Sequence, residues 1–302
     1  MSNQQASLRI ADREPVVQGQ SVPCDVYCIE SKGERIWIDP PTHVSYTLPD
    51  EAIRRVFYTH PPVQADKAFP AYEVWLGEED LRMLRTEQDT RQCFVREGYP
   101  EWELPSAFRE WESFAQVCVQ PVIDGEIIHI GGCELQCIHT PGPTPGHICL
   151  YLPSEQTLFA GALLSQQPKL FCSEQNPHAL ENLLKSLEKI KELPVQRVFP
   201  VWEGSASVRD RADQIIRTCY FRILELLRLV QDHPGLTAYE LAGRFSRQEN
   251  VWKDIPAREK MEAMEETLAY LNYLRERDYV RAVTENDVRV NVPGKRRLTD
   301  VV

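Results

Sequence analysis

Residues 138–151 read Ile-His-Thr-Pro-Gly-Pro-Thr-Pro-Gly-His-Ile-Cys-Leu-Tyr, and this stretch decides the fold. Its two Pro-Gly pairs, Pro141-Gly142 and Pro145-Gly146, mark tight turns inside a loop. Apolar strand patterns flank that loop over 133–139 and 148–152. The stretch therefore predicts two neighbouring strands whose connection is a shaped, turn-rich loop.

The same kind of pattern continues on both sides of this stretch. Strands are predicted over 26–30, 35–39, 55–59, 120–122, 126–130, 157–160 and 195–200. Helices are predicted over 78–85 and 176–191, the second from leucines at a spacing of three and four, and a proline-rich loop is predicted over 61–75. Strands mixed with helices in this order predict an α+β fold in which helices cover two sheets.

Near Asp210 the predicted structure changes from mixed strands and helices to mainly helices. A helix is predicted over 211–229, a short helix follows Thr237, and a long helix runs over 257–276. Thr237 and Glu240 have the spacing of a capping box, and two strands, 279–283 and 288–292, end the pattern. This order is typical of a winged-helix-like domain, so we expect two domains, 1–209 and 210–302.

Residues 138–151, together with Leu158-Phe159-Ala160-Gly161-Ala162-Leu163-Leu164, resemble the metallo-β-lactamase superfamily. That family carries H-T-P-G-H-T-P-G-H-x-x-L-Y followed by L-F-x-G-D-x-L. Segments 36–39, 56–60 and 198–204 resemble its other motifs, in the same order. The resemblance implies an αββα sandwich with a C-terminal module like that of the β-lactamase-like-2 and glyoxalase II-like branch.

The family binds one or two zinc ions through seven His and Asp ligands, and these activate a water molecule. Matched one by one, His60 takes the place of the first ligand. The other six positions hold Pro62, Gln64, Ala65, Pro143, Ala162 and Trp202. Proline and alanine side chains have no donor atom and tryptophan has only an N–H. We therefore expect neither a zinc ion nor another cofactor in this cleft.

Two functions remain open. The first is a degenerate protein, a pseudoenzyme, that keeps a more apolar cleft for binding or scaffolding, with Asp39 and His147 bracing its loops as the resemblance implies. The second is a hydrolase of a thioester, ester or phosphodiester that uses His60 with Asp66, Glu203 or Cys172 in a metal-free or rebuilt site. Each of these candidate residues could instead have a structural role. His60 would then suit the turn after its strand, Asp66 and Glu203 would be solvated carboxylates, and Cys172 would be an unreactive thiol.

Charge and composition bear on partners and location. The net charge of −11 belongs entirely to residues 1–209, since residues 210–302 hold 16 basic and 16 acidic residues. An acidic body and a long helix rich in glutamate disfavour binding to nucleic acid. The polar N-terminus, the lack of a long apolar run and nine scattered cysteines predict a cytoplasmic protein that does not bind membranes. A small molecule or a protein is the expected partner, and a homodimer is a further possibility.

Overall fold

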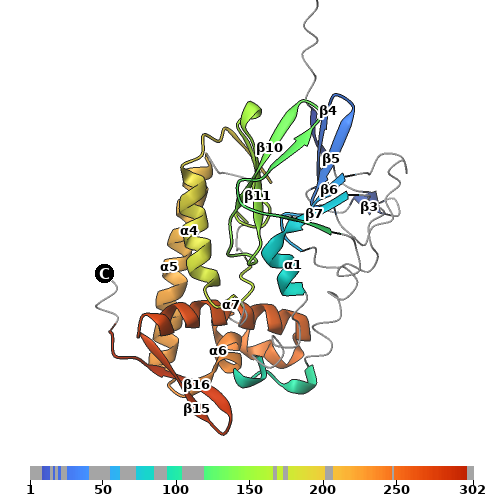
Figure 1. Ribbon diagram of the computed structural model, residues 1–302. Helices are drawn as coiled ribbons and strands as arrows, with labels where there is room; N and C mark the ends of the chain where they lie inside the picture. Colours follow the sequence, from blue (N-terminus) through green and yellow to red (C-terminus); the bar gives the residue numbers. More distant parts are fainter. Residues whose placement is uncertain are drawn as a thin grey trace, which may run out of the picture.

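Two β-sheets pack face to face, and helices cover the second sheet and continue into a C-terminal helical region (Figure 1). The computed structural model describes residues 9–13, 16–17, 20–21, 26–40, 55–61, 73–84, 94–103, 119–165, 169–172, 176–200, 207–246 and 248–297. The predicted α+β sandwich is confirmed. Pro62, Gln64, Ala65, Asp66, Trp202 and Glu203 lie outside the described residues.

The first sheet has six strands in the order β1-β4-β5-β6-β7-β8. They are β1 (Arg9–Arg13), β4 (Val26–Ser31), β5 (Glu34–Ile38), β6 (Arg55–Phe57), β7 (Glu73–Gly77) and β8 (Val119–Val122), beside a separate ribbon of β2 (Val16–Val17) and β3 (Gln20–Ser21). Neighbours from β5 to β8 are parallel, so their carboxyl ends meet at one edge. The prediction of a loop over 61–75 is wrong for residues 73–75. These residues belong to β7, which begins at Glu73 and has the alternating burial of a strand.

The second sheet has the order β13-β12-β11-β10-β9. Its strands are β9 (Ile127–Ile130), β10 (Cys133–His139), β11 (Ile148–Leu152), β12 (Thr157–Phe159) and β13 (Arg197–Phe199). Strand β11 is buried along its whole length: Ile148, Leu150 and Leu152 face the first sheet, whereas Cys149 and Tyr151 face the helices. This alternation explains why the strand reads as a continuous apolar run.

Helices flank the sheets as the sequence predicts. Helix α1 (Glu78–Leu84) packs on β7 and β8, and α4 (Ala179–Lys191) packs beside the long α5 (Val208–Asp232). Leu180, Leu183 and Leu187 of α4 are buried against the outer face of the second sheet. Short 3-10 turns occur as η1 (Glu101–Glu103), η3 (Pro153–Glu155) and η4 (Glu249–Asp254). Helix α5 begins three residues before the predicted helix, where Ser207 caps it.

The C-terminal region follows α5 with β14 (Leu236–Thr237), α6 (Ala238–Phe245), α7 (Ala257–Glu276), β15 (Val280–Glu285) and β16 (Val288–Pro293). The predicted capping box is confirmed: Thr237 accepts from the Glu240 N–H, and the Glu240 side chain accepts from the Thr237 N–H. One hydrophobic core joins the second sheet, α4, α5, α6 and α7. The domain boundary near Asp210 therefore stays a prediction.

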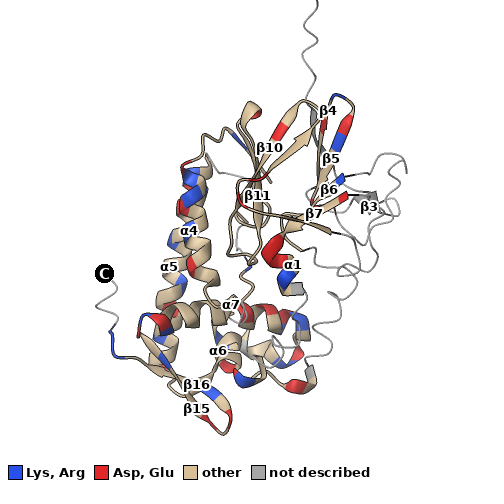
Figure 2. Cartoon of the chain, in the orientation of Figure 1, with Lys and Arg blue, Asp and Glu red and all other residues tan. Residues whose placement is uncertain are grey.

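Charged side chains lie along the outer turns of α4, α5 and α7 and at the β4–β5 hairpin, whereas β11 is almost free of them (Figure 2). Among the described residues, no helix has the length and apolar character needed to cross a membrane.

Candidate functional site

The candidate site lies where the carboxyl end of β6 meets the loop between β10 and β11. The Asp39 N–H donates to the Phe57 carbonyl, and the Ile148 N–H donates to the Thr59 carbonyl at 2.9 Å. The first bond joins the ends of β5 and β6 within the first sheet, and the second joins the edge of the first sheet to that of the second. The turn-rich loop of residues 140–147 and the end of β12 complete the site around His60.

Asp39 and His60 are linked through the hydroxyl of Thr59. Asp39 Oδ1 accepts from the Thr59 N–H and Oδ2 accepts from Thr59 Oγ1, both at 2.7 Å. His60 Nδ1 lies 2.8 Å from the same oxygen. Because the only hydroxyl proton goes to Asp39, His60 must donate through Nδ1–H. Its Nε2 therefore keeps a free electron pair, and the imidazole is half-buried.

His147 is held by a longer, directed chain of hydrogen bonds. The Ala162 N–H donates to Nε2 at 3.2 Å, and Nδ1 lies 2.9 Å from Thr140 Oγ1. Thr140 donates its hydroxyl proton to Cys149 Sγ, and Cys149 donates to the Ala160 carbonyl. Both nitrogens of His147 are thus used inside the protein.

Burial lowers the pKa of His147 well below its ordinary value, and the nearby His60 and His139 add to the effect. His147 is therefore neutral at physiological pH. Its ring stacks on that of His60, with centroids 5.8 Å apart. A neutral, fixed imidazole supports the position of His60 but offers no free atom to a ligand.

Gly161 and Gly146 let the backbone come close enough to form the site. Gly161 has a φ of +51°, and a Cβ there would meet Thr59 Oγ1 and would lie 2.9 Å from His147 Nε2. Gly146 packs on α1, where its N–H donates to Asp80 Oδ1, and Thr144 donates to Asp80 Oδ2, both at 2.7 Å. Asp80 is fully buried. The sequence reasoning missed Thr59, Thr140 and Asp80, although Thr59 directly precedes His60.

The described ligand positions of the family carry little that binds metal. Pro143 is buried and its carbonyl accepts from the Phe171 N–H at 3.0 Å. Ala162 presents only a methyl group, and its N–H is directed at His147. Within the described part of the site, His60 Nε2 is the one side-chain atom with a free electron pair at these positions. Asp39 already accepts two bonds from Thr59.

Among the described residues, the donors at these positions do not by themselves fit the zinc ions that the fold family implies. A first-row ion needs three or four protein ligands, and one imidazole supplies a single bond. Elsewhere in the described chain, His178, Glu181 and Glu276 are the group that could hold a cation. That group lies between the start of α4 and the end of α7, where His178 Nδ1 is 2.7 Å from Glu276.

Cys172 is not brought to the site as a nucleophile would be. Its side chain is only 1% exposed and lies in the core shared with α4, α5 and α7, where Asn272 Nδ2 approaches its sulfur at 3.5 Å. A substrate cannot reach a thiol in that position. His60, with a half-buried ring and a free Nε2, is the better candidate for contact with a ligand.

Comparisons with known proteins show which proteins the chain is similar to. The model of the metallo-beta-lactamase superfamily matches residues 80–202. A beta-lactamase-like protein 2 homolog of Caenorhabditis elegans is 29% identical over 128 residues, which cover 41% of this chain and 40% of that protein. An atrochrysone carboxyl ACP thioesterase of Aspergillus terreus is 38% identical over 42 residues, which cover 14% of this chain and 13% of that protein. The chain thus matches less than half of the length of these two relatives.

Solved structures share the fold over nearly the whole chain. A metallo-beta-lactamase family protein of Thermus thermophilus has a TM-score of 0.75 at 22% identity and covers 95% of this chain and 98% of its own. A beta-lactamase domain protein of Burkholderia ambifaria has a TM-score of 0.73 at 15% identity, covering 95% of this chain and 92% of its own. The C-terminal helical region is thus part of the shared architecture.

Proposed function

We propose that the chain, whose residues 80–202 match the model of the metallo-β-lactamase superfamily and whose fold is shared with solved structures of that kind, is a degenerate member that does not hydrolyse through zinc. Its cleft is retained to bind a small molecule or a protein segment. The observation that carries this proposal is Ala162, which stands where the family has an aspartate bridging two metal ions. Its N–H is directed at His147, and its side chain has no oxygen to offer.

The chemistry of the residues supports a binding role. Apolar or uncharged residues stand at the six other positions where the motif resemblance places metal ligands, so a charged metal–water centre would give way to a less charged site beside the His60 imidazole. His60 Nε2 can accept a hydrogen bond from a ligand N–H or O–H, and the relay to Asp39 fixes its direction. A ligand with an apolar body and one hydrogen-bond donor fits these groups.

Metal analysis tests the proposal. Protein purified without chelator should contain far less than one zinc ion per chain, and so should the His60→Ala variant. His178→Ala serves as the matched control, because it removes the surface group with Glu181 and Glu276 that could bind stray zinc. Stoichiometric zinc that persists in His178→Ala and is lost in His60→Ala would overturn the proposal.

One observation favours a second candidate, a metal-free hydrolase. The link from Asp39 through Thr59 to His60 orients an imidazole whose free Nε2 can act as a general base. In thioester hydrolysis, Nε2 takes a proton from water while the water oxygen adds to the carbonyl carbon. Collapse of the adduct breaks the carbon–sulfur bond, and the leaving thiolate recovers the proton. The thioesterase name of an Aspergillus relative makes a thioester the first substrate to test.

This candidate predicts hydrolysis of an N-acetylcysteamine thioester that falls about 100-fold or more in His60→Ala. His129→Ala is the matched control, since His129 is exposed on β9 and outside the site. Equal turnover in the wild type and His60→Ala would remove the hydrolase and leave the binding role.

A further inference from the structure

A second cavity lies between α5 and α7, outside the candidate site. Its volume is about 560 Å³, and it opens beside α6 and residues 169–170. None of the residues that form the Asp39–Thr59–His60 link or the His147 chain lines it. This inference is therefore independent of the proposed function.

The walls combine an apolar floor with acidic residues. The apolar and aromatic part consists of Leu170, Leu183, Ile215, Phe245 and Tyr270. Helix α7 contributes four glutamates, namely Glu259, Glu262, Glu265 and Glu266. A volume of this size accommodates a small organic molecule.

Most charges in the cavity already have partners. Glu262 accepts from Lys169 at 2.6 Å and from Arg258 at 3.2 Å. Arg222 donates to Glu266 at 2.9 Å and lies over the Phe245 ring, 3.6 Å from its centroid. The cations that face the cavity are thus neutralised by residues other than Glu265.

Glu259, which is exposed, and Glu265, which is half-buried, are the exceptions. Within the described chain, the Glu265 carboxyl group has no hydrogen bond and no ion pair, and its side chain lines the cavity. Desolvation by the surrounding protein, with Glu262 nearby, raises the pKa of Glu265 well above the ordinary value. Its side chain is half-buried, so a ligand in the cavity can reach the carboxyl group. A ligand that supplies a positive charge would favour the ionised carboxylate.

We propose that this cavity binds a small organic cation, with an aliphatic or aromatic body on the apolar floor and an ammonium group paired with Glu265. The four glutamates outnumber Lys169 and Arg222, so the cavity repels anions and attracts cations. The rings of Phe245 and Tyr270 add surfaces suited to a cation or an aromatic body.

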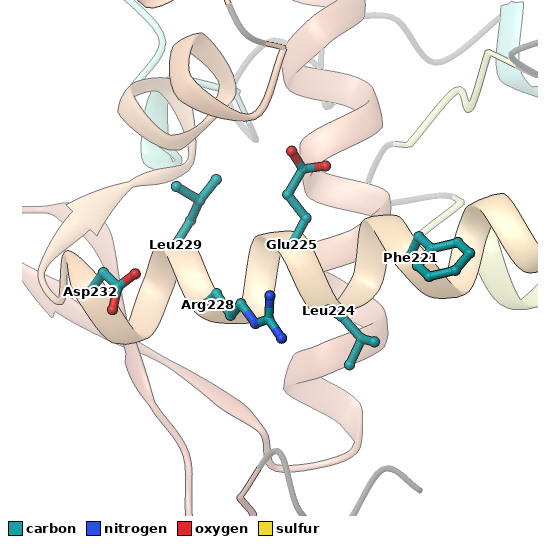
Figure 3. A pocket seen from close by; sticks show the side chains of 6 residues that line it. All are labelled: Phe221, Leu224, Glu225, Arg228, Leu229 and Asp232. Atoms are coloured by element: carbon teal, nitrogen blue, oxygen red, sulfur yellow. The ribbon is translucent and has the colours of Figure 1, made fainter.

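A second concave region, a groove on α5, is less enclosed than this cavity. The groove of about 410 Å³ in Figure 3 is lined by six residues, Phe221, Leu224, Glu225, Arg228, Leu229 and Asp232, which all belong to α5. One helix cannot enclose a ligand, whereas the larger cavity has walls from α5, α6 and α7. The groove is therefore not a candidate binding site.

The test uses phenethylammonium and its neutral analogue 2-phenylethanol, titrated into the full chain by calorimetry. The ammonium compound should bind about tenfold or more tightly than the alcohol. Glu265→Gln should abolish that difference, while Glu285→Gln, which changes an exposed glutamate of β15 outside the cavity, should leave it intact. The Glu265→Gln variant keeps the side-chain volume and removes the repulsion between Glu265 and Glu262, so its thermal midpoint should not fall.

Binding should also strengthen as pH rises, because the cation binds the ionised form of Glu265 and a proton is released. Titrations in buffers of different ionisation enthalpy measure that proton. Three ionisable groups act on Glu265 electrostatically, namely Glu262, Lys169 and Arg258. Other ionisable groups that line the cavity are Cys219 and Arg222 of α5 and Glu259, Glu266 and Tyr270 of α7. Equal affinity for both probes, no binding of the ammonium compound at millimolar concentration, or an unchanged preference in Glu265→Gln would overturn the proposal.

Discussion

At the scale of single residues, two threonine hydroxyls determine what the histidines of the site can do. The Thr59 hydroxyl gives its proton to Asp39 and leaves His60 with a free Nε2. The Thr140 hydroxyl gives its proton to Cys149, and His147 is fully used by Thr140 and Ala162. Two histidines with rings 5.8 Å apart therefore differ in role: one can meet a ligand and the other supports it.

Gly161 makes this arrangement possible, and its replacement should disrupt it. In Gly161→Ala, the added methyl group would meet the Thr59 hydroxyl and crowd His147 at a position with a φ of +51°. We expect a loss of about 1–3 kcal/mol in the free energy of unfolding, measured by urea denaturation. Gly33→Ala is a control for the positive φ alone, since nothing lies within 4 Å of a Cβ there. Equal losses in the two variants would show that crowding at Thr59 is unimportant.

At the scale of elements, the sequence predicted the helices and strands that are specified by local apolar periodicity and turn residues. Strands β10 and β11 and helix α7 match their predicted bounds, because apolar periodicity and flanking turns specify them. Strand β7 was missed because prolines dominate the segment before it. The cluster of Asp39, His60 and His147 was predicted from motif resemblance. No local signal marked Asp80, since it bonds to Thr144 and Gly146, more than 60 residues away.

Asp80 should make the stability of the protein depend on pH through the contact of α1 with the 140–147 loop. Burial raises its pKa from 3.8 to about 7, although bonds from Thr144 and Gly146 favour the charged form. The folded protein then binds a proton that the unfolded chain releases, so Asp80 reduces the free energy of unfolding as pH rises from 3.8 to about 7. The slope is about 1.4 kcal/mol per pH unit at most.

Asp80→Asn should remove this slope, because an amide keeps the shape and the oxygen acceptor without titrating. Urea denaturation of the wild type and the variant at several pH values measures the difference. Relative to the wild type, the free energy of unfolding of the variant should increase up to about pH 7 and then stay constant. A difference that is constant with pH would show that Asp80 does not titrate in this range.

At the scale of the whole molecule, the C-terminal region is built into the fold. Helix α5 packs on α4 in one half of its length and on α6 and α7 in the other (Figure 1). The charge boundary near Asp210 falls inside this shared helix. A change in net charge along the chain therefore does not mark a break in the core. Long-range side-chain pairs instead hold distant segments together.

The ion pair between Glu97 and Arg275 joins residues 94–103 to the C-terminal region. Glu97 is 1% exposed and accepts from both Nη atoms of Arg275, at 3.0 and 2.9 Å, and from Arg289 at 3.2 Å. Tyr99 adds a hydrogen bond to the Ala257 carbonyl. These contacts cross more than 150 residues of sequence, which is why sequence reasoning could not find them.

Glu97→Ala should therefore destabilise the whole molecule. The variant leaves Arg275, which is 15% exposed, without its carboxylate, and an arginine stranded in this way costs about 3–5 kcal/mol. Glu97→Gln should cost less, because the amide oxygen still accepts one bond, and Glu101→Ala should cost little, since Glu101 is exposed. Urea denaturation of the three variants measures these losses. If Glu97→Ala lies within about 1 kcal/mol of the wild type, the pair with Arg275 does not hold residues 94–103 to the C-terminal region.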